Sequence, residues 1–127
     1  MSYKVNSIYF NEYNYIAVFV KGLINTEDTI VDLINYTITE MKKNNCKSVF
    51  FDLSETFSFL TTSNSFDIAV KLPEMIKIDD YRWSVFYKND THTYSMVSGI
   101  TSKKGMKNLM LTDVKEDALE WVLNQNL

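Results

Sequence analysis

The stretch SVFFDL, Ser48–Leu53, is a short and nearly continuous apolar run. A strand with one solvated face shows alternating polar and apolar residues, whereas a strand covered on both faces is apolar at successive positions. The run therefore predicts a central strand of a sheet that has helices on both sides. This arrangement is typical of α/β folds with parallel central strands.

Two extended segments precede this run. Tyr3–Phe10 and Tyr15–Lys21 are rich in aromatic and β-branched residues, and the polar cluster at 11–14 between them is typical of a turn. The short connection predicts an antiparallel hairpin, and we expect Gly22 to end its second strand. The hairpin therefore adds an antiparallel edge to the sheet.

A long amphipathic helix is predicted between the hairpin and the central run. Asn25 or Thr26 is the expected N-cap, and Lys42 and Lys43 stand at the end where the helix dipole is negative. The apolar side of this helix recurs at helical spacing: Ile30, Leu33, Ile34, Thr37, Ile38 and Met41.

Helices and strands are predicted to alternate after the central run. One helix begins near Ser63 and is broken or kinked at Pro73, and the last helix opens with a capping box formed by Asp113 and Glu116. The segments between them are a strand at Arg82–Tyr87, a helix within Asp90–Lys104 and a strand at Asn108–Leu111. We therefore expect an α/β fold in three layers, with a mixed, mostly parallel sheet and about four helices, as one domain spanning residues 1–127.

The composition favours a folded protein that neither crosses a membrane nor binds nucleic acid. The 127 residues are 46% hydrophobic and 23% charged, and the net charge is −3. A weakly acidic chain is a poor match for a phosphate backbone, and no run approaches the roughly 18 apolar residues of a membrane span. Residues 1–10 contain no basic stretch followed by an apolar one, so we expect a cytoplasmic protein.

The residues that usually carry catalysis or bind metals are scarce. One histidine, His92, and one cysteine, Cys46, are predicted at opposite ends of the strands, too far apart for a nucleophile–base pair. Three isolated glycines form no phosphate-binding loop, and the acidic residues resemble helix caps and solvated faces more than metal ligands. We therefore expect no enzyme activity, no cofactor and no metal.

Three motifs resemble the STAS domains, and among them the SpoIIAA-like bacterial proteins. Gly22 leads into Asn25–Asp28, similar to the G-x-I-T-x-E-D motif that opens the family's first helix. Val49–Leu53 resembles the family strand that closes in Asp-Leu, and Lys115–Val122 is similar to its E-E-A-L-x-W-L ending. The resemblance implies the STAS fold and a regulatory role through protein binding, similar to that of anti-sigma-factor antagonists. The partner would be a different protein or, in a homodimer, a second copy of the chain.

The phosphorylation motif of that family is altered in this sequence. Anti-sigma-factor antagonists carry Asp-Ser-(Ser)-Gly at the start of the second helix, where a partner kinase phosphorylates the serine. The corresponding stretch here is FLTTS at residues 59–63, in which Leu60 replaces the aspartate and the glycine is missing. Thr61, Thr62 and Ser63 are therefore candidates either for phosphorylation or for capping the helix alone.

Six large apolar residues follow the central strand: Phe57, Phe59, Leu60, Phe66, Leu72 and Met75. Ligands of open α/β sheets sit at the carboxyl ends of the strands, and three interpretations stay open. The six residues form a partner surface together with 54–63 and 88–92. Alternatively they line an apolar groove for a small ligand or lipid, as the resemblance to Sec14-type domains implies, or they pack in the core.

Overall fold

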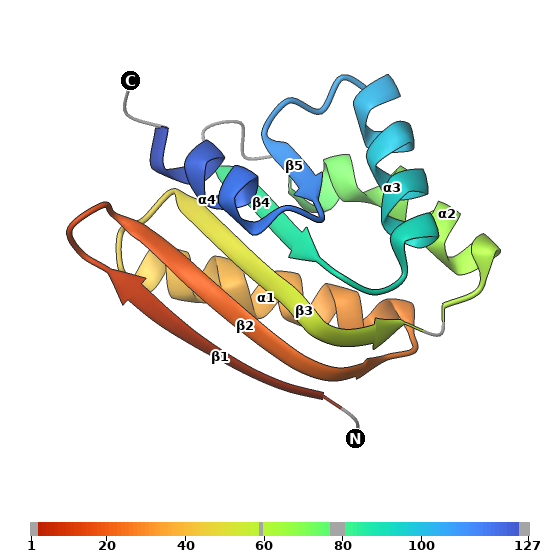
Figure 1. Cartoon of the computed structure of the whole chain (residues 1–127), viewed down its shortest axis with the longest axis horizontal. Helices are drawn as coiled ribbons and strands as arrows, with labels where there is room; N and C mark the ends of the chain where they lie inside the picture. The colour runs from red at the N-terminus through yellow and green to blue at the C-terminus, as the bar shows by residue number, and fades with distance from the viewer. Residues whose placement is uncertain (1–2, 59, 77–80, 125–127) are drawn as a thin grey trace.

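The computed structural model describes residues 3–58, 60–76 and 81–124 (Figure 1). Within these ranges, strands and helices alternate in the predicted order after an opening hairpin. The elements are β1 (Tyr3–Phe10), β2 (Tyr15–Ile24), α1 (Glu27–Lys43), β3 (Ser48–Ser58), α2 (Thr62–Met75), β4 (Arg82–Tyr87), α3 (Thr91–Lys103), β5 (Leu109–Thr112) and α4 (Lys115–Leu123). The predicted α/β class and the antiparallel start of the sheet are confirmed.

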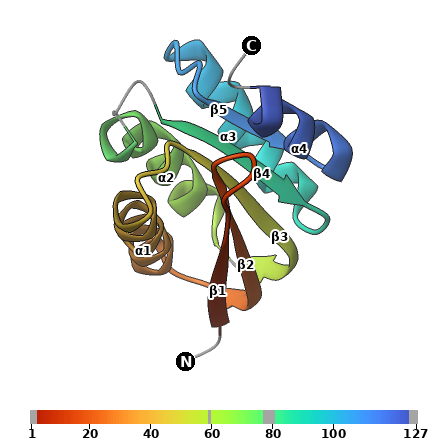
Figure 2. The ribbon, with the colours of Figure 1, turned by 90° about the vertical axis from the view of Figure 1, so that its left-hand side faces the viewer.

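The strands of the described sheet lie side by side in chain order, β1-β2-β3-β4-β5. β1 pairs antiparallel with β2, and every later pair is parallel. Parallel strands are joined by right-handed crossovers. Because all the crossovers here advance in the same direction along the sheet, they place α1, α2 and α3 on one face. α4 follows β5 and covers the other face, so the two outer layers are unequal (Figure 2).

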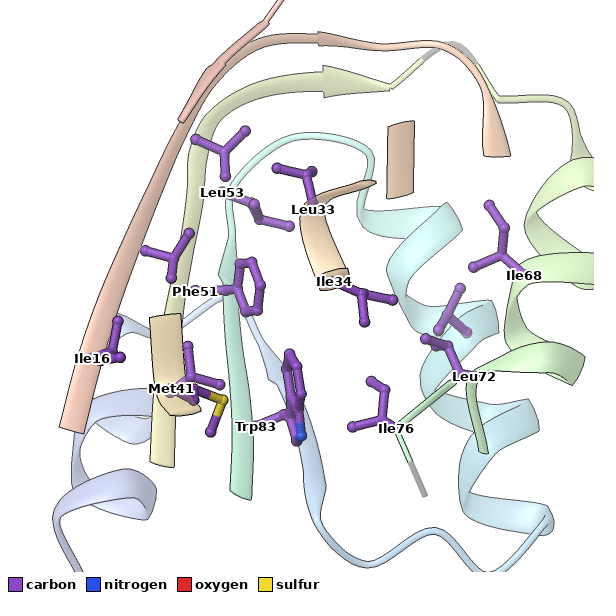
Figure 3. Packing of buried hydrophobic residues seen from close by; sticks show 14 of the residues in the cluster. Ile16, Leu33, Ile34, Met41, Phe51, Leu53, Ile68, Leu72, Ile76 and Trp83 are labelled. Carbon is purple, nitrogen blue, oxygen red and sulfur yellow. The ribbon is translucent and has the colours of Figure 1, made fainter. Parts of the chain in front are cut away.

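Two hydrophobic cores lie on the two faces of the sheet. The larger core, beneath three helices, contains Phe51 and Trp83, whose rings stack with their centroids 5.8 Å apart (Figure 3). The smaller core, beneath α4, is built around Phe50 and Phe86. Phe50 and Phe51 thus belong to opposite faces and are both buried, which explains the continuous apolar pattern of β3.

Both strands of the β2–β3 pair extend beyond their predicted ends. β2 continues past Gly22 to Ile24, and β3 continues past Leu53 to Ser58. Gly22 does not end its strand but stays in the ladder opposite Thr56, with a φ of 120° that glycine adopts without steric cost. The predicted ends were wrong because pairing between the two strands, and not the local sequence, sets their length.

The predicted N-cap of α1 is confirmed. The predicted break of α2 at Pro73 is not found at that residue, because the helix continues to Met75. Thr26 is the N-cap of α1, and its hydroxyl accepts the backbone N–H of Thr29 at 3.2 Å. α2 passes through Pro73 and ends at Met75. Pro73 removes one backbone donor from the final turn, and the helix stops shortly after it.

The predicted capping box at the start of α4 is wrong. The N-cap position is Val114, which makes no side-chain cap, and Asp113 and Glu116 are exposed. The backbone N–H of Val114 instead donates to the hydroxyl of Thr112 at 3.1 Å. Asp113 stands one residue too early in the chain to serve as the cap.

Candidate functional site

The most distinctive local feature of the sheet is a bulge in β3. Phe19 pairs with Asp52, but the next paired residues are Lys21 and Glu55, so β3 carries an extra residue. The Asp52 carboxylate holds the bulge, because its Oδ1 accepts the backbone N–H of Ser54 at 3.0 Å and the Ser54 hydroxyl at 2.6 Å. Asp52, a polar residue within the apolar run, therefore stabilises the bulge.

The bulge reverses which residues of β3 point to which face of the sheet. Before it, Phe51 and Leu53 belong to the core beneath the three helices. After it, Thr56 is 1% exposed and Ser58 lines a cavity on the helix side, whereas Phe57 is 56% exposed. A strictly alternating strand would place Phe57 on the same face as Phe51. The bulge is therefore what turns the ring of Phe57 to solvent.

The loop between β4 and α3 is fastened to the outer end of β3. The side-chain amide of Asn89 donates to the Thr56 carbonyl oxygen at 2.9 Å, and the backbone N–H of Ser58 donates to Asp90 Oδ2 at 2.7 Å. Asp90 has a left-handed backbone with a φ of 59°, which aspartate tolerates better than most residues. His92 follows in the first turn of α3 and is exposed. The loop therefore lies beside the end of β3, as predicted.

Tyr94 of α3 packs near the outer end of β3, on the side of the sheet that the three helices cover. Its ring stacks on Tyr87 with centroids 4.7 Å apart, and its hydroxyl is hydrogen-bonded to Thr56. Burial raises the pKa of Tyr94 to about 12, an effect that the bond to Thr56 opposes and the charge of Asp90 reinforces. Tyr94 is therefore neutral across the physiological range and serves as a packing group.

The start of α2 presents exposed hydroxyl side chains. Thr61 is the N-cap, and its Oγ1 accepts the backbone N–H of Asn64 at 3.0 Å, so capping accounts for this residue. Thr62 and Ser63 stand in the first turn, which contains no acidic residue. Their hydroxyls are exposed at the positive end of the helix dipole.

The apolar candidates divide into a surface group and a core group. Phe57 and Phe66 are 56% and 51% exposed. Leu60 and Leu72 line the cavity on the helix side, and Met75 packs against the larger core. The candidate at position 59 lies outside the described residues. The two exposed rings thus flank, in the chain, the segment that joins β3 to α2: Phe57 lies in β3 and Phe66 in α2.

Cys46 and His92 lie at opposite ends of the strands. Cys46 stands just before the amino end of β3 and is 2% exposed, whereas His92 follows the carboxyl end of the parallel strand β4. The Cys46 thiol donates to the Ser48 carbonyl oxygen at 3.1 Å. Burial raises the pKa of this thiol, which disfavours the reactive thiolate. These two residues therefore do not form a nucleophile–base pair.

Among the residues that the structure describes, no group of three His, Cys, Asp or Glu side chains is placed to hold a metal ion. Across the described ranges, no helix combines the length and the apolar character that a membrane crossing requires.

The contacts that shape this edge were not predicted, although Ser54, Asn89 and Asp90 fall within the ranges expected to form it. Asp52 and Ser54 form the bulge, and Asn89 and Asp90 fasten the loop. The Asp-x-Ser spacing was a usable signal, because aspartate side chains commonly bond a backbone N–H two residues ahead. The bonds from Asn89 and Asp90 had no local signal, because they join residues 33 and 32 positions apart.

Comparison with known proteins identifies the fold. No family model matches the chain, and no curated protein matches its sequence significantly. An anti-sigma factor antagonist from Mycobacterium paratuberculosis matches with a TM-score of 0.63 at 17% identity, over 95% of this chain and 94% of that chain. A variant of RsbS from Moorella thermoacetica matches with a TM-score of 0.60 at 7% identity, over 97% of each chain. The anti-sigma factor antagonist SpoIIAA, in its unphosphorylated form, matches with a TM-score of 0.53 at 10% identity, over 95% of this chain and 99% of that chain.

The chain has the SpoIIAA-like fold. The resemblance carried by its sequence motifs is thereby confirmed at the level of fold, over nearly the whole chain. In this SpoIIAA-like chain, the bulge in β3, the loop at 88–92 and the start of α2 meet at the carboxyl edge of the sheet.

Proposed function

We propose that this chain is a non-enzymatic regulatory domain of the STAS type that works by binding a partner protein. Its binding surface, called the junction surface below, comprises Phe57, Thr62, Ser63 and Phe66, with the loop at 88–92 beside it. The observation that supports this most directly is the bulge in β3, which holds the ring of Phe57 at 56% exposure. Anti-sigma factor antagonists among the structures of similar fold support a regulatory role.

A rigidly held surface ring suits protein recognition. Aromatic side chains supply a large share of the binding energy at protein interfaces, and a group that is ordered before binding loses little conformational freedom. Phe57 is ordered in this way, because it pairs with Leu23 of β2 and its neighbour Ser58 is bonded to Asp90. Core packing alone gives no reason to hold a phenylalanine outward.

Phosphorylation of Thr62 or Ser63 would regulate the junction surface. A phosphate in the first turn of a helix is stabilised by free backbone N–H groups and by the helix dipole, and the first turn of α2 has no acidic side chain to repel it. The added charge of about −1.5 to −2 would oppose the docking of an apolar or acidic partner near Phe66. Thr61 is the weaker acceptor, because its hydroxyl already caps the helix.

The partner is a different protein or a second copy of the chain, and the compartment we propose is the cytoplasm. The one cysteine, Cys46, is a buried free thiol, which suits a reducing compartment.

The junction surface is tested by affinity capture with the full chain as bait. The Phe57→Ala, Phe66→Ala double variant should lose the partner that the unaltered chain retains, with an affinity reduced about tenfold or more in a titration with the purified partner. Phe10→Ala is the matched control, because Phe10 is 38% exposed on β1 and pairs with Tyr15 at the opposite end of the sheet. If the double variant and the control bind alike, the surface is wrongly placed.

Sedimentation equilibrium of the same proteins identifies the class of partner. A homodimer that dissociates in the double variant but not in the Phe10→Ala control would make a second copy the partner. A monomer that captures a different protein through the same surface would make the partner a heterologous one. The proposed function holds in both cases, and capture that does not depend on Phe57 and Phe66 contradicts it.

The regulatory step is tested separately with charge-adding variants. Thr62→Glu and Ser63→Glu should weaken binding of the captured partner, whereas Thr39→Glu should not, because Thr39 is an exposed threonine on α1. Equal affinity in all of these variants would remove the phosphorylation switch and leave the binding surface in place.

A further inference from the structure

An apolar cavity of about 110 Å³ lies between the sheet and the three helices of the larger core. Its walls come from β2, β3, β4 and β5 on the sheet side and from α1, α2 and α3 opposite. Figure 3 shows Phe51 and Trp83 on one side of this region and Ile68, Leu72 and Ile76 on the other. The cavity therefore reaches into the main core and is partly open at its rim, and its lining contains none of the exposed side chains of the segment between β3 and α2.

The chemistry of the walls limits what the cavity can hold. No charged side chain lines it, and the polar residues of the lining are Ser58, Trp83 and Tyr94. Tyr94 stays neutral to high pH because burial raises its pKa to about 12. A charged molecule would lose its hydration there without gaining a partner, at a cost of several kcal/mol or more. The cavity therefore selects for neutral, mostly apolar molecules.

One donor in the wall lacks a partner. Trp83 is 1% exposed, and its indole Nε1 is buried without a hydrogen-bond partner among the described residues. Most buried polar groups are paired, because leaving a donor unpaired costs about 1–3 kcal/mol. Because this nitrogen is closed off from the cavity, a molecule bound there cannot reach it, and Trp83 contributes only the apolar part of its ring to the wall. The walls therefore suit a ligand that is apolar over its whole surface.

The volume sets the size of the ligand. An apolar cavity of about 150 Å³ in another protein stays dry and binds benzene, and this cavity, at about 110 Å³, is of the same order. It fits a single five- or six-membered ring or a short alkyl chain. A long acyl chain exceeds the volume, so the lipid occupant implied by the Sec14 resemblance does not suit this space.

We propose that the core cavity is a binding site for a small, neutral, apolar molecule that packs against the ring of Trp83. This inference does not rest on the junction surface or on any partner protein. Benzene serves as the probe of the apolar space.

Binding is measured on the full chain by the two indole N–H signals in a ¹⁵N-correlated NMR spectrum. Benzene should shift the Trp83 signal through its ring current. Trp121 is the internal control, because its ring lies against the Arg82 guanidinium at 3.8 Å on the other face of the sheet. At ten times the Kd, Tm should rise by about 5 °C. No shift at Trp83, or equal shifts at both tryptophans, would overturn the proposal.

Filling the cavity provides the second test. Val97 is 7% exposed and lines the cavity, so Val97→Phe should abolish the benzene-dependent rise in Tm. Val114→Phe makes the same change at a residue that is 42% exposed on the surface, and it should keep the rise. Leu72→Phe is a second filling variant in case Val97→Phe does not fold. A rise that persists in a folded filling variant places the binding elsewhere and contradicts the assignment, whatever the outcome of partner capture.

Discussion

The inner and outer halves of β3 are continuous in the chain and opposite in character. Residues 49–52 pair with β2 on one side and with β4 on the other, and Phe50 and Phe51 are buried on opposite faces. Within the described sheet, the residues after the bulge pair with β2 alone, and Phe57 turns to solvent. One inserted residue thus separates a half of the strand that builds the core from a half that turns a phenylalanine ring to solvent.

The largest expected effect is the loss of a ring from the inner half. Phe51→Ala should lower the free energy of unfolding by about 3–5 kcal/mol, because it leaves a cavity and removes the stack on Trp83. Urea unfolding measures the change. Phe57→Ala removes the same side chain from the outer half and should change stability by no more than about 0.5 kcal/mol. Equal losses in the two variants would show that the halves do not differ as described.

The packing of Tyr94 behind the outer half of β3 should become less stabilising at alkaline pH. Burial raises the pKa of Tyr94 from 10.0 to about 12, so between these values the unfolded chain loses the proton while the native chain keeps it. The free energy of unfolding attributable to Tyr94 is therefore intact below pH 10 and falls by up to about 1.4 kcal/mol per pH unit above it. Tyr94→Phe keeps the stack on Tyr87 and should flatten that part of the alkaline fall. An unchanged slope in the variant would contradict the assignment.

The bulge that separates the halves can be weakened directly. Asp52→Ala removes both hydrogen bonds to Ser54 and should cost about 1–2 kcal/mol in urea unfolding. It should also reduce partner capture, because the orientation of Phe57 depends on the bulge. Asp52→Asn keeps the acceptor oxygen and should retain most of both properties. If Asp52→Ala captures the partner as well as the unaltered chain does, the link between bulge and surface fails.

The smallest expected effect lies just beyond the outer half, at the start of α2. Thr61→Ala removes the N-cap bond to Asn64 and should cost about 1 kcal/mol. Thr62→Ala is the matched control, because it removes a hydroxyl from the next residue without removing a cap, and it should change stability by no more than about 0.5 kcal/mol. Thermal or urea unfolding of the pair separates capping from the regulatory role proposed for Thr62.

The inner half of β3 was predictable from sequence, and the outer half was not. Successive apolar residues in Ser48–Leu53 are the pattern of a strand covered on both faces, and the long periodic helix of α1 has a signal of the same strength. In the residues after Asp52, the bulge reverses which positions are buried, so a regular alternation predicts the wrong face for Phe57. The length of β2 and β3 also depends on their mutual pairing, which no local pattern reveals.

The location of the candidate site was predictable from the sequence, but the contacts that build it were not. The order of strands and helices brings the end of β3 and the start of α2 to the carboxyl edge of the sheet, so Thr61–Ser63 could be located there. The contacts from Asn89 and Asp90 depend on the loop conformation and on a left-handed residue. The cavity depends on how three helices pack against the sheet, and a composition or a periodicity carries no information about that volume.

The sequential order of the strands has a consequence for biosynthesis. A β-hairpin closes in about 1–10 μs, long before the ribosome, at about 5–20 residues per second, has delivered the next strand. Because β1-β2-β3-β4-β5 is also the order of emergence, each later strand adds to a free edge and none has to be inserted between two others. The nascent chain can therefore assemble its sheet progressively from β1 onward, and the short last strand, β5, and then α4 are added at the end of this order.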